Sequence, residues 1–214
     1  MTTRLQLRGI VRRRLGDTNV DPLWDDAVLN DAIAAGMRRY SARVPRQATA
    51  SVPVGGGDRV VAVPPDINPL RVVRVFDDGG TLWPRWEGPL EQTPGPNGPS
   101  SDATWRVWGQ ELVLAQPAPR TGGWRLEHLT HRTVPEDDTA AIDLQAGDED
   151  LIIAQTLAIA LERRAIADGK SWSGRGPVHP LAAAARTARM DADRLFWERR
   201  PRGLMDAWIL CPFE

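Results

Sequence analysis

The segment that decides the fold is residues 104–170, TWRVWGQELVLAQPAPRTGGWRLEHLTHRTVPEDDTAAIDLQAGDEDLIIAQTLAIALERRAIADGK. Its first part places apolar residues at alternate positions, which is the period of a β-strand, and glycine and proline separate the runs. After Asp150, apolar residues recur every three or four positions, which is the period of an α-helix. We therefore predict a hairpin around Gly109-Gln110, a single strand near Trp124, an acidic connection and a helix over about 148–168.

Two further helices are predicted ahead of this segment and one after it. The first spans about 3–15, the second about 25–43 and the last about 181–199. Gly16 ends the first helix, and Val44-Pro45 stops the second, because a residue before proline disfavours helical geometry. Along the chain, helical periodicity gives way to strand periodicity and then returns, which indicates an α+β fold. We expect a bundle of about four helices, split in the sequence, with a small antiparallel β domain inserted into it.

The changes of period also give domain boundaries. The predicted parts are the N-terminal half of the bundle (1–46), the inserted β domain (47–134), the C-terminal half of the bundle (135–199) and an extended tail (200–214).

Two more hairpins are predicted at the start of the β domain. Run 47–54 alternates in polarity, and the valine-rich run 60–63 returns after three consecutive glycines; runs 70–76 and 82–86 flank an Asp-Gly turn. The glycines are not a phosphate-binding loop, because neither a Gly-Lys-Ser/Thr motif nor a helix follows them. Residues 88–102 are rich in proline and glycine and predict a long loop.

Composition excludes several classes of protein. The 214 residues carry a formal net charge of −1, which does not favour general binding of polyanions. The one cysteine, Cys211, excludes an intrachain disulfide and a Cys-x-x-Cys metal site. The N-terminal residues lack the apolar run of a signal peptide. No run approaches the roughly 20 apolar residues that a membrane span needs.

Arginines gather on one side of the first predicted helix. Arg4, Arg8 and Arg12 are four residues apart, and Arg13 adjoins them. Like charges at this spacing repel each other, so the helix needs anionic neighbours. These neighbours are the acidic connection of the same chain, another subunit or nucleic acid; a solvated or salt-bridged face is the default.

The last residues of the chain are unusually apolar. Chain ends are commonly polar and frayed, so such a segment has to pack either on its own domain or on another protein. Its apolar residues are Leu204, Met205, Trp208, Ile209, Leu210 and Phe213.

No catalytic constellation stands out. His128 and His131 are three residues apart in a predicted strand, so they face opposite sides and do not share a metal ion. Asp137-Asp138 and 148–150 lack the repeating oxygen-ligand pattern of a calcium loop. We expect a non-enzymatic protein with no metal ion and no other cofactor.

Five of the nine tryptophans fall in the predicted β domain. Large aromatic residues fill a thin core well, and core packing is the first interpretation. An exposed platform of tryptophans for binding carbohydrate or another surface is the alternative. The five are Trp83, Trp86, Trp105, Trp108 and Trp124.

The order of these motifs resembles the head-to-tail adaptor (connector or neck) proteins of tailed bacteriophages. The N-terminal part of the resemblance is LRGIVRRRLGDTNVDPLWDDAVLNDAIAAGMRRYSARVPR, an arginine-bearing helix ending in Leu-Gly-Asp and then a Trp-capped helix. VVAVPPDINPLRVVRVFDDGGTLWP and WRVWGQELVLAQPAPRTGGWRLEHLTH are similar to the small β domain that many of these adaptors carry. The resemblance spans residues 4 to about 167, and related gene-transfer particles share the arrangement.

This resemblance implies a structural virion protein at the head–tail junction, assembled in the host cytoplasm. It implies a ring, commonly of twelve copies, between the portal protein and a tail-side neck or tail-tube protein. Double-stranded DNA would pass through the ring without its sequence being read. The resemblance further implies that the apolar C-terminal tail docks on the portal. The face formed by Arg4, Arg8, Arg12 and Arg13 would meet a neighbouring subunit or the channel.

Overall fold

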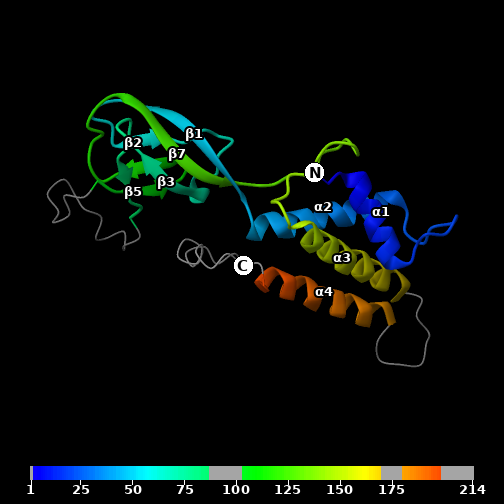
Figure 1. The fold of residues 1–214 in the computed structure, drawn as a ribbon. Coiled ribbons are helices and arrows are strands. Elements are labelled where there is room, and N and C mark those ends of the chain that lie inside the picture. Colours follow the sequence, from blue (N-terminus) through cyan, green and yellow to red (C-terminus); the bar gives the residue numbers. More distant parts are fainter. Residues whose placement is uncertain (1, 87–102, 170–179, 199–214) are drawn as a thin grey trace. The chain divides into compact units, whose positions relative to one another are not determined.

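The computed structural model describes residues 2–86, 103–169 and 180–198. It divides the chain into two compact units, one formed by residues 1–45 with 131–214 and the other by residues 46–130. The first unit is helical and the second consists of strands (Figure 1). The α+β fold expected from the sequence, helices with antiparallel sheets, is confirmed.

Capping residues set the boundaries of the first two helices. Helix α1 (Arg4–Leu15) is capped by Thr3, whose side chain accepts from the Gln6 N–H while the Gln6 side chain accepts from the Thr3 N–H. It ends at Gly16, whose φ of +69° is left-handed and suits glycine. Helix α2 (Asp26–Arg43) has Asp25 as its N-cap.

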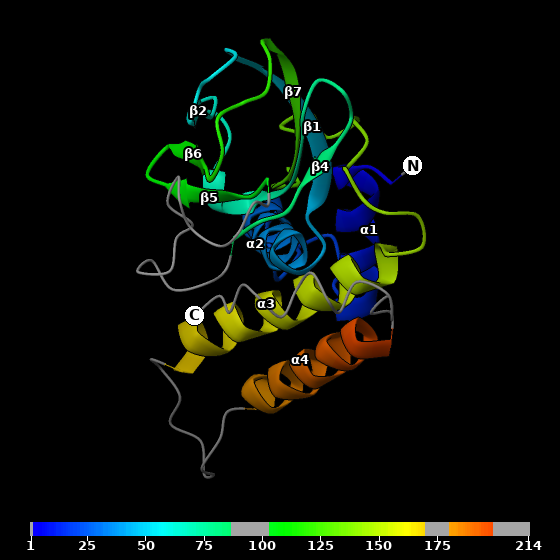
Figure 2. The ribbon, with the colours of Figure 1, turned by 90° about the vertical axis from the view of Figure 1, so that its left-hand side faces the viewer.

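Helix α3 (Glu149–Gly169) is the centre of the helical unit. It packs against α1, α2 and α4 (Pro180–Glu198), and Figures 1 and 2 both show α4 alongside it. The α2 backbone comes close at Gly36, where an added Cβ would lie 3.1 Å from the Thr156 hydroxyl. The core joins residues from all four helices and from the connection before α3, among them Leu7, Val11, Leu29, Ile33, Met37, Tyr40, Ile142, Leu151, Ile152 and Ile159.

The second unit packs two small antiparallel sheets around tryptophan. One sheet has the order β1-β7-β3-β4 and the other the order β2-β6-β5. The Trp83 and Trp124 rings lie 4.6 Å apart between their centroids, and the Trp105 indole N–H donates to the Trp83 carbonyl at 2.8 Å. The strands are β1 (Arg46–Val54), β2 (Val60–Ala62), β3 (Val72–Phe76), β4 (Leu82–Trp83), β5 (Trp105–Trp108), β6 (Glu111–Leu114) and β7 (Gly122–Thr130).

The hairpin expected from runs 47–54 and 60–63 is wrong. Strand β1 pairs along its whole length with β7, and β2 pairs with β6 in the other sheet. The Asp58 carboxylate accepts from the Gly55 N–H at 2.7 Å, and this turn carries the chain from one sheet to the other. The other two predicted hairpins are confirmed as β3–β4 and β5–β6. A 3₁₀ turn, Pro69–Arg71, precedes β3.

Candidate functional site

The arginine face of α1 is paired with carboxylates of the same chain. Asp138, in the connection before α3, contacts both Arg4 and Arg8, at 2.9 Å from the latter. Asp26, at the start of α2, contacts Arg8 at 3.3 Å and Arg12 at 2.6 Å. Arginines of α1 and carboxylates of other segments therefore alternate along this face. These ion pairs attach α1 to the connection before α3 and to the start of α2.

Asp17 completes this series of ion pairs and holds the loop after α1. Its side chain is almost fully buried and lies 2.9 Å from the Arg12 guanidinium. The same carboxylate accepts from the backbone N–H groups of Leu23, at 2.6 Å, and Trp24, at 3.2 Å. A buried carboxylate needs such partners, so the loop is fixed around it.

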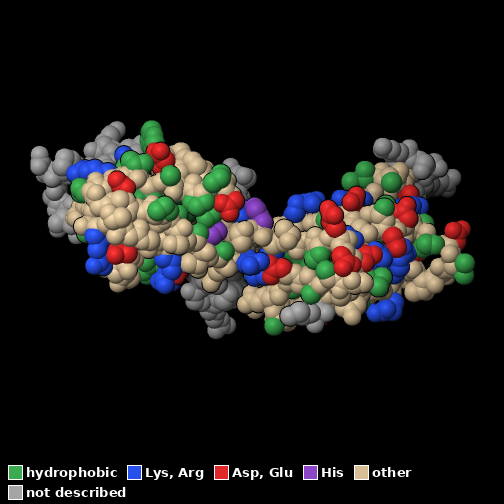
Figure 3. Space-filling view, turned by 90° about the horizontal axis from the view of Figure 1, so that it is seen from above, with side chains coloured by type: hydrophobic (Ala, Val, Ile, Leu, Met, Phe, Trp, Pro, Cys, Tyr) green, Lys and Arg blue, Asp and Glu red, His purple; other side chains and the backbone are tan. Residues whose placement is uncertain are grey.

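The ion pairs determine the electrostatics of this face. Hydrogen bonds from Arg4 and then Arg8 hold the pKa of Asp138 below its usual value. In Figure 3, acidic and basic side chains lie side by side over the helical unit. The acidic connection, one of the three expected neighbours, is thus present. Contact of this face with another subunit or with a channel stays a prediction.

Arg13 differs from its neighbours in the sequence. Its side chain is exposed, and over the described ranges it takes part in no salt bridge. Of the four arginines assigned to the face, it is the one whose charge no carboxylate among the described residues balances.

A second polar network lies at the C-terminal end of α2. The Tyr40 hydroxyl donates to Asp148 at 2.7 Å, and burial, with the Asp148 hydrogen bond, raises the pKa of Tyr40 to about 12. Arg132 donates to the Val44 carbonyl at 2.7 Å and to the Asp143 carboxylate at 2.8 Å. Sequence reasoning missed this network, because its partners are up to 108 residues apart and no local spacing indicates it.

Most tryptophans of the predicted β domain are buried inside the β unit. Trp83, Trp105 and Trp124 are buried and belong to its core, whereas Trp108 is exposed. The core interpretation is correct for these three, and they cannot form an exposed carbohydrate-binding platform.

The candidate tail residues lie outside the described part of the chain, as do residues 88–102. They are Leu204, Met205, Trp208, Ile209, Leu210 and Phe213. Among the residues that the structure does describe, no three or more His, Cys, Asp or Glu side chains gather as metal ligands. None of the described helices is long and apolar enough to cross a membrane.

Comparison with known proteins gives one assignment. No curated protein matches the chain significantly. The model of the SU10 adaptor protein family matches residues 2–205, which covers both units. The chain therefore belongs to the SU10 adaptor protein family and is a structural adaptor of the bacteriophage type.

Proposed function

We propose that this protein forms a ring between the portal and the tail of the virion, extends the DNA channel and attaches the tail to the DNA-filled head. The observation that carries the proposal is the family match over residues 2–205. A helical unit with an inserted β unit, the architecture expected for such adaptors, supports it. A ring of twelve copies is the expected assembly, with the portal on one side and a neck or tail-tube protein on the other.

In this proposal residues 204–213 attach the ring to the portal. The apolar residues Trp208, Ile209, Leu210 and Phe213 would gain free energy by leaving water. Ordering the backbone of such a segment costs a comparable amount, so a single segment binds weakly. A ring presents many copies at once, and the linked copies bind together by avidity.

Electron microscopy of the protein mixed with the portal protein from the same genome tests the proposal. We expect a ring of added density on the portal with the full chain. A chain that lacks residues 203–214 should remain folded by circular dichroism and fail to attach. The matched control replaces the four apolar residues Trp208, Ile209, Leu210 and Phe213 by serine at unchanged length and should fail equally. Undiminished attachment of both variants refutes the docking role, and absence of any ring with the full chain refutes the adaptor position.

A further inference from the structure

The loop between α1 and α2 presents apolar side chains, and Asp17 holds its two ends together. Val20 is fully exposed and Leu23 is 51% exposed, although both are apolar. Asp17 fixes the loop through the Leu23 and Trp24 N–H groups, and the Trp24 side chain is buried in the core. Figure 1 shows this loop projecting beyond the ends of the two helices that it joins. We call residues 18–23 the apolar loop.

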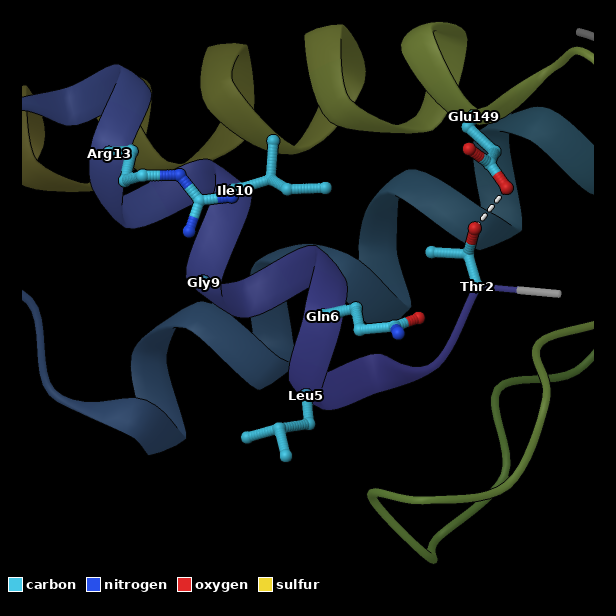
Figure 4. Close-up of a pocket in the computed structure, with 7 residues that line it drawn as sticks. All are labelled: Thr2, Leu5, Gln6, Gly9, Ile10, Arg13 and Glu149. Carbon is cyan, nitrogen blue, oxygen red and sulfur yellow. Dashed lines mark hydrogen bonds between the residues drawn. The ribbon is translucent and has the colours of Figure 1, made fainter.

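A groove of about 450 Å³ follows one side of α1 (Figure 4). Leu5 and Ile10 supply its apolar surface. Gly9 lies between them in the sequence, and because it has no side chain the helix surface there is open. Polar groups stand at the two ends, with Arg13 toward the end of α1 and Glu149 at the start of α3. We call this surface the α1 groove; its lining residues are Thr2, Leu5, Gln6, Gly9, Ile10, Arg13 and Glu149.

The apolar loop and the Arg13 end of the α1 groove carry opposite charges. Asp21 is exposed and adjoins Val20, and Arg13 is exposed in the groove. In the described segments of this chain, neither residue forms a salt bridge with a third residue or with the other. Their neighbours Arg12 and Asp17, by contrast, are paired with each other.

We propose that the apolar loop of one copy docks in the α1 groove of the next copy, with Val20 and Leu23 against Leu5 and Ile10, and Asp21 paired with Arg13. The inference rests on the proposed ring and names its subunit contact. Loop and groove are different surfaces of one chain, so the contact is head-to-tail, and repetition of such a contact forms a ring where the rotation between neighbouring copies closes. Asp17 already holds the two ends of the loop together, which lowers the conformational entropy that docking costs.

Charge reversal tests the ion pair. Arg13→Glu and Asp21→Arg should each lower the fraction of portals that carry a ring at limiting protein concentration by at least about tenfold, because like charges then meet at every contact. The double variant should recover the wild-type fraction. Asp66→Arg, an exposed charge reversal in the β unit, is the control and should leave the fraction unchanged.

A second variant fills the groove without disturbing the fold. A Cβ built at Gly9 meets only the end of the Arg13 side chain, at 3.7 Å, so the backbone there accepts a side chain, and leucine favours helix over glycine. We expect normal circular dichroism and thermal unfolding for Gly9→Leu, together with loss of rings. A wild-type fraction of ring-bearing portals with Gly9→Leu and with each single charge reversal would overturn the inference. The proposed function would remain intact, because rings still form on the portal.

Cross-linking tests the contact between the apolar loop and the α1 groove without the portal protein. In a Cys211→Ser background, a Val20→Cys chain mixed with a Gln6→Cys chain at high concentration should give a mixed dimer with a short bis-maleimide. Either chain alone should give at least tenfold less dimer. Mixed dimer without rings on the portal supports the contact and counts against the proposed function. No mixed dimer, with rings present on the portal, overturns the contact alone.

Discussion

At the scale of single residues, the helical unit is held by polar groups that span large sequence separations. Arg132 donates its backbone N–H to the Ser41 hydroxyl at 2.8 Å and its guanidinium to Val44 and Asp143. The same guanidinium lies 5.6 Å from the centre of the Tyr40 ring. This one side chain therefore joins the segment that enters the helical unit after β7 to the end of α2.

Replacement of Arg132 by alanine is expected to destabilise the helical unit by about 1–3 kcal/mol, since it leaves the partly buried Val44 carbonyl and Asp143 carboxylate without their donor. Urea unfolding followed by circular dichroism measures this change. Arg38→Ala removes an exposed arginine of α2 and should change the free energy of unfolding by less than about 0.5 kcal/mol. Equal effects of the two substitutions contradict the assigned role.

Tyr40 offers a direct titration, because it is the only tyrosine in the chain. Its pKa is about 12 in the folded protein, against about 10 for an unfolded chain. A raised pKa contributes stability below pH 10 that is lost as the pH rises through 12. At about pH 11 the native chain should show little tyrosinate absorbance near 295 nm, and the urea-unfolded chain should be mostly ionised. Equal absorbance in both states would falsify the raised pKa of Tyr40 and, with it, the assigned effect of burial and of the Asp148 hydrogen bond.

At the scale of elements, α4 is attached differently from α3. Helix α3 buries ten residues, whereas α4 buries only Ala185 and Ala192 among its described side chains. Small residues permit close packing but bury little apolar surface. Charged groups supply further contacts: Arg189 lies 2.7 Å from Glu162 of α3, and Arg43 of α2 lies 3.0 Å from Asp193.

Arg189→Ala should therefore loosen α4 while leaving α3 in place. The expected loss is about 1 kcal/mol, because both partners of the Arg189–Glu162 pair are partly exposed to solvent. Hydrogen exchange should become faster in residues 180–198 and stay unchanged in residues 150–160. Arg194→Ala, on the exposed side of α4, is the matched control and should change neither segment. Equal acceleration in both helices would show that α3 and α4 open together.

At the scale of the whole molecule, the chain enters and leaves the β unit at adjacent points. Arg46 and Thr130 are paired residues of β1 and β7, so both ends of the inserted segment meet in the sheet. The unit also has its own core, which includes Trp83, Trp105 and Trp124. A segment with a separate core and neighbouring ends meets the conditions for folding alone.

We therefore expect residues 46–130, expressed alone, to fold cooperatively. The buried tryptophans should give a strong near-ultraviolet circular dichroism signal that disappears in a single urea transition. In the complementary chain, a short glycine-serine linker joins Pro45 to His131, and we expect it to keep its helical signal. A β segment that lacks near-ultraviolet signal, beside a folded full-length chain, would contradict its independence.

The amino-acid sequence by itself determined the helices, the β3–β4 and β5–β6 hairpins and the α+β class. Periodicity and capping are local: Thr3, Gly16 and Asp25 set the helix boundaries through groups within a few residues. The tertiary structure alone decided that β1 pairs with β7 and β2 with β6, because a strand with one apolar face suits any sheet that covers that face. It also decided which carboxylates face Arg4, Arg8 and Arg12. Asp138 is more than 120 residues away from any of them, and only packing brings such groups together.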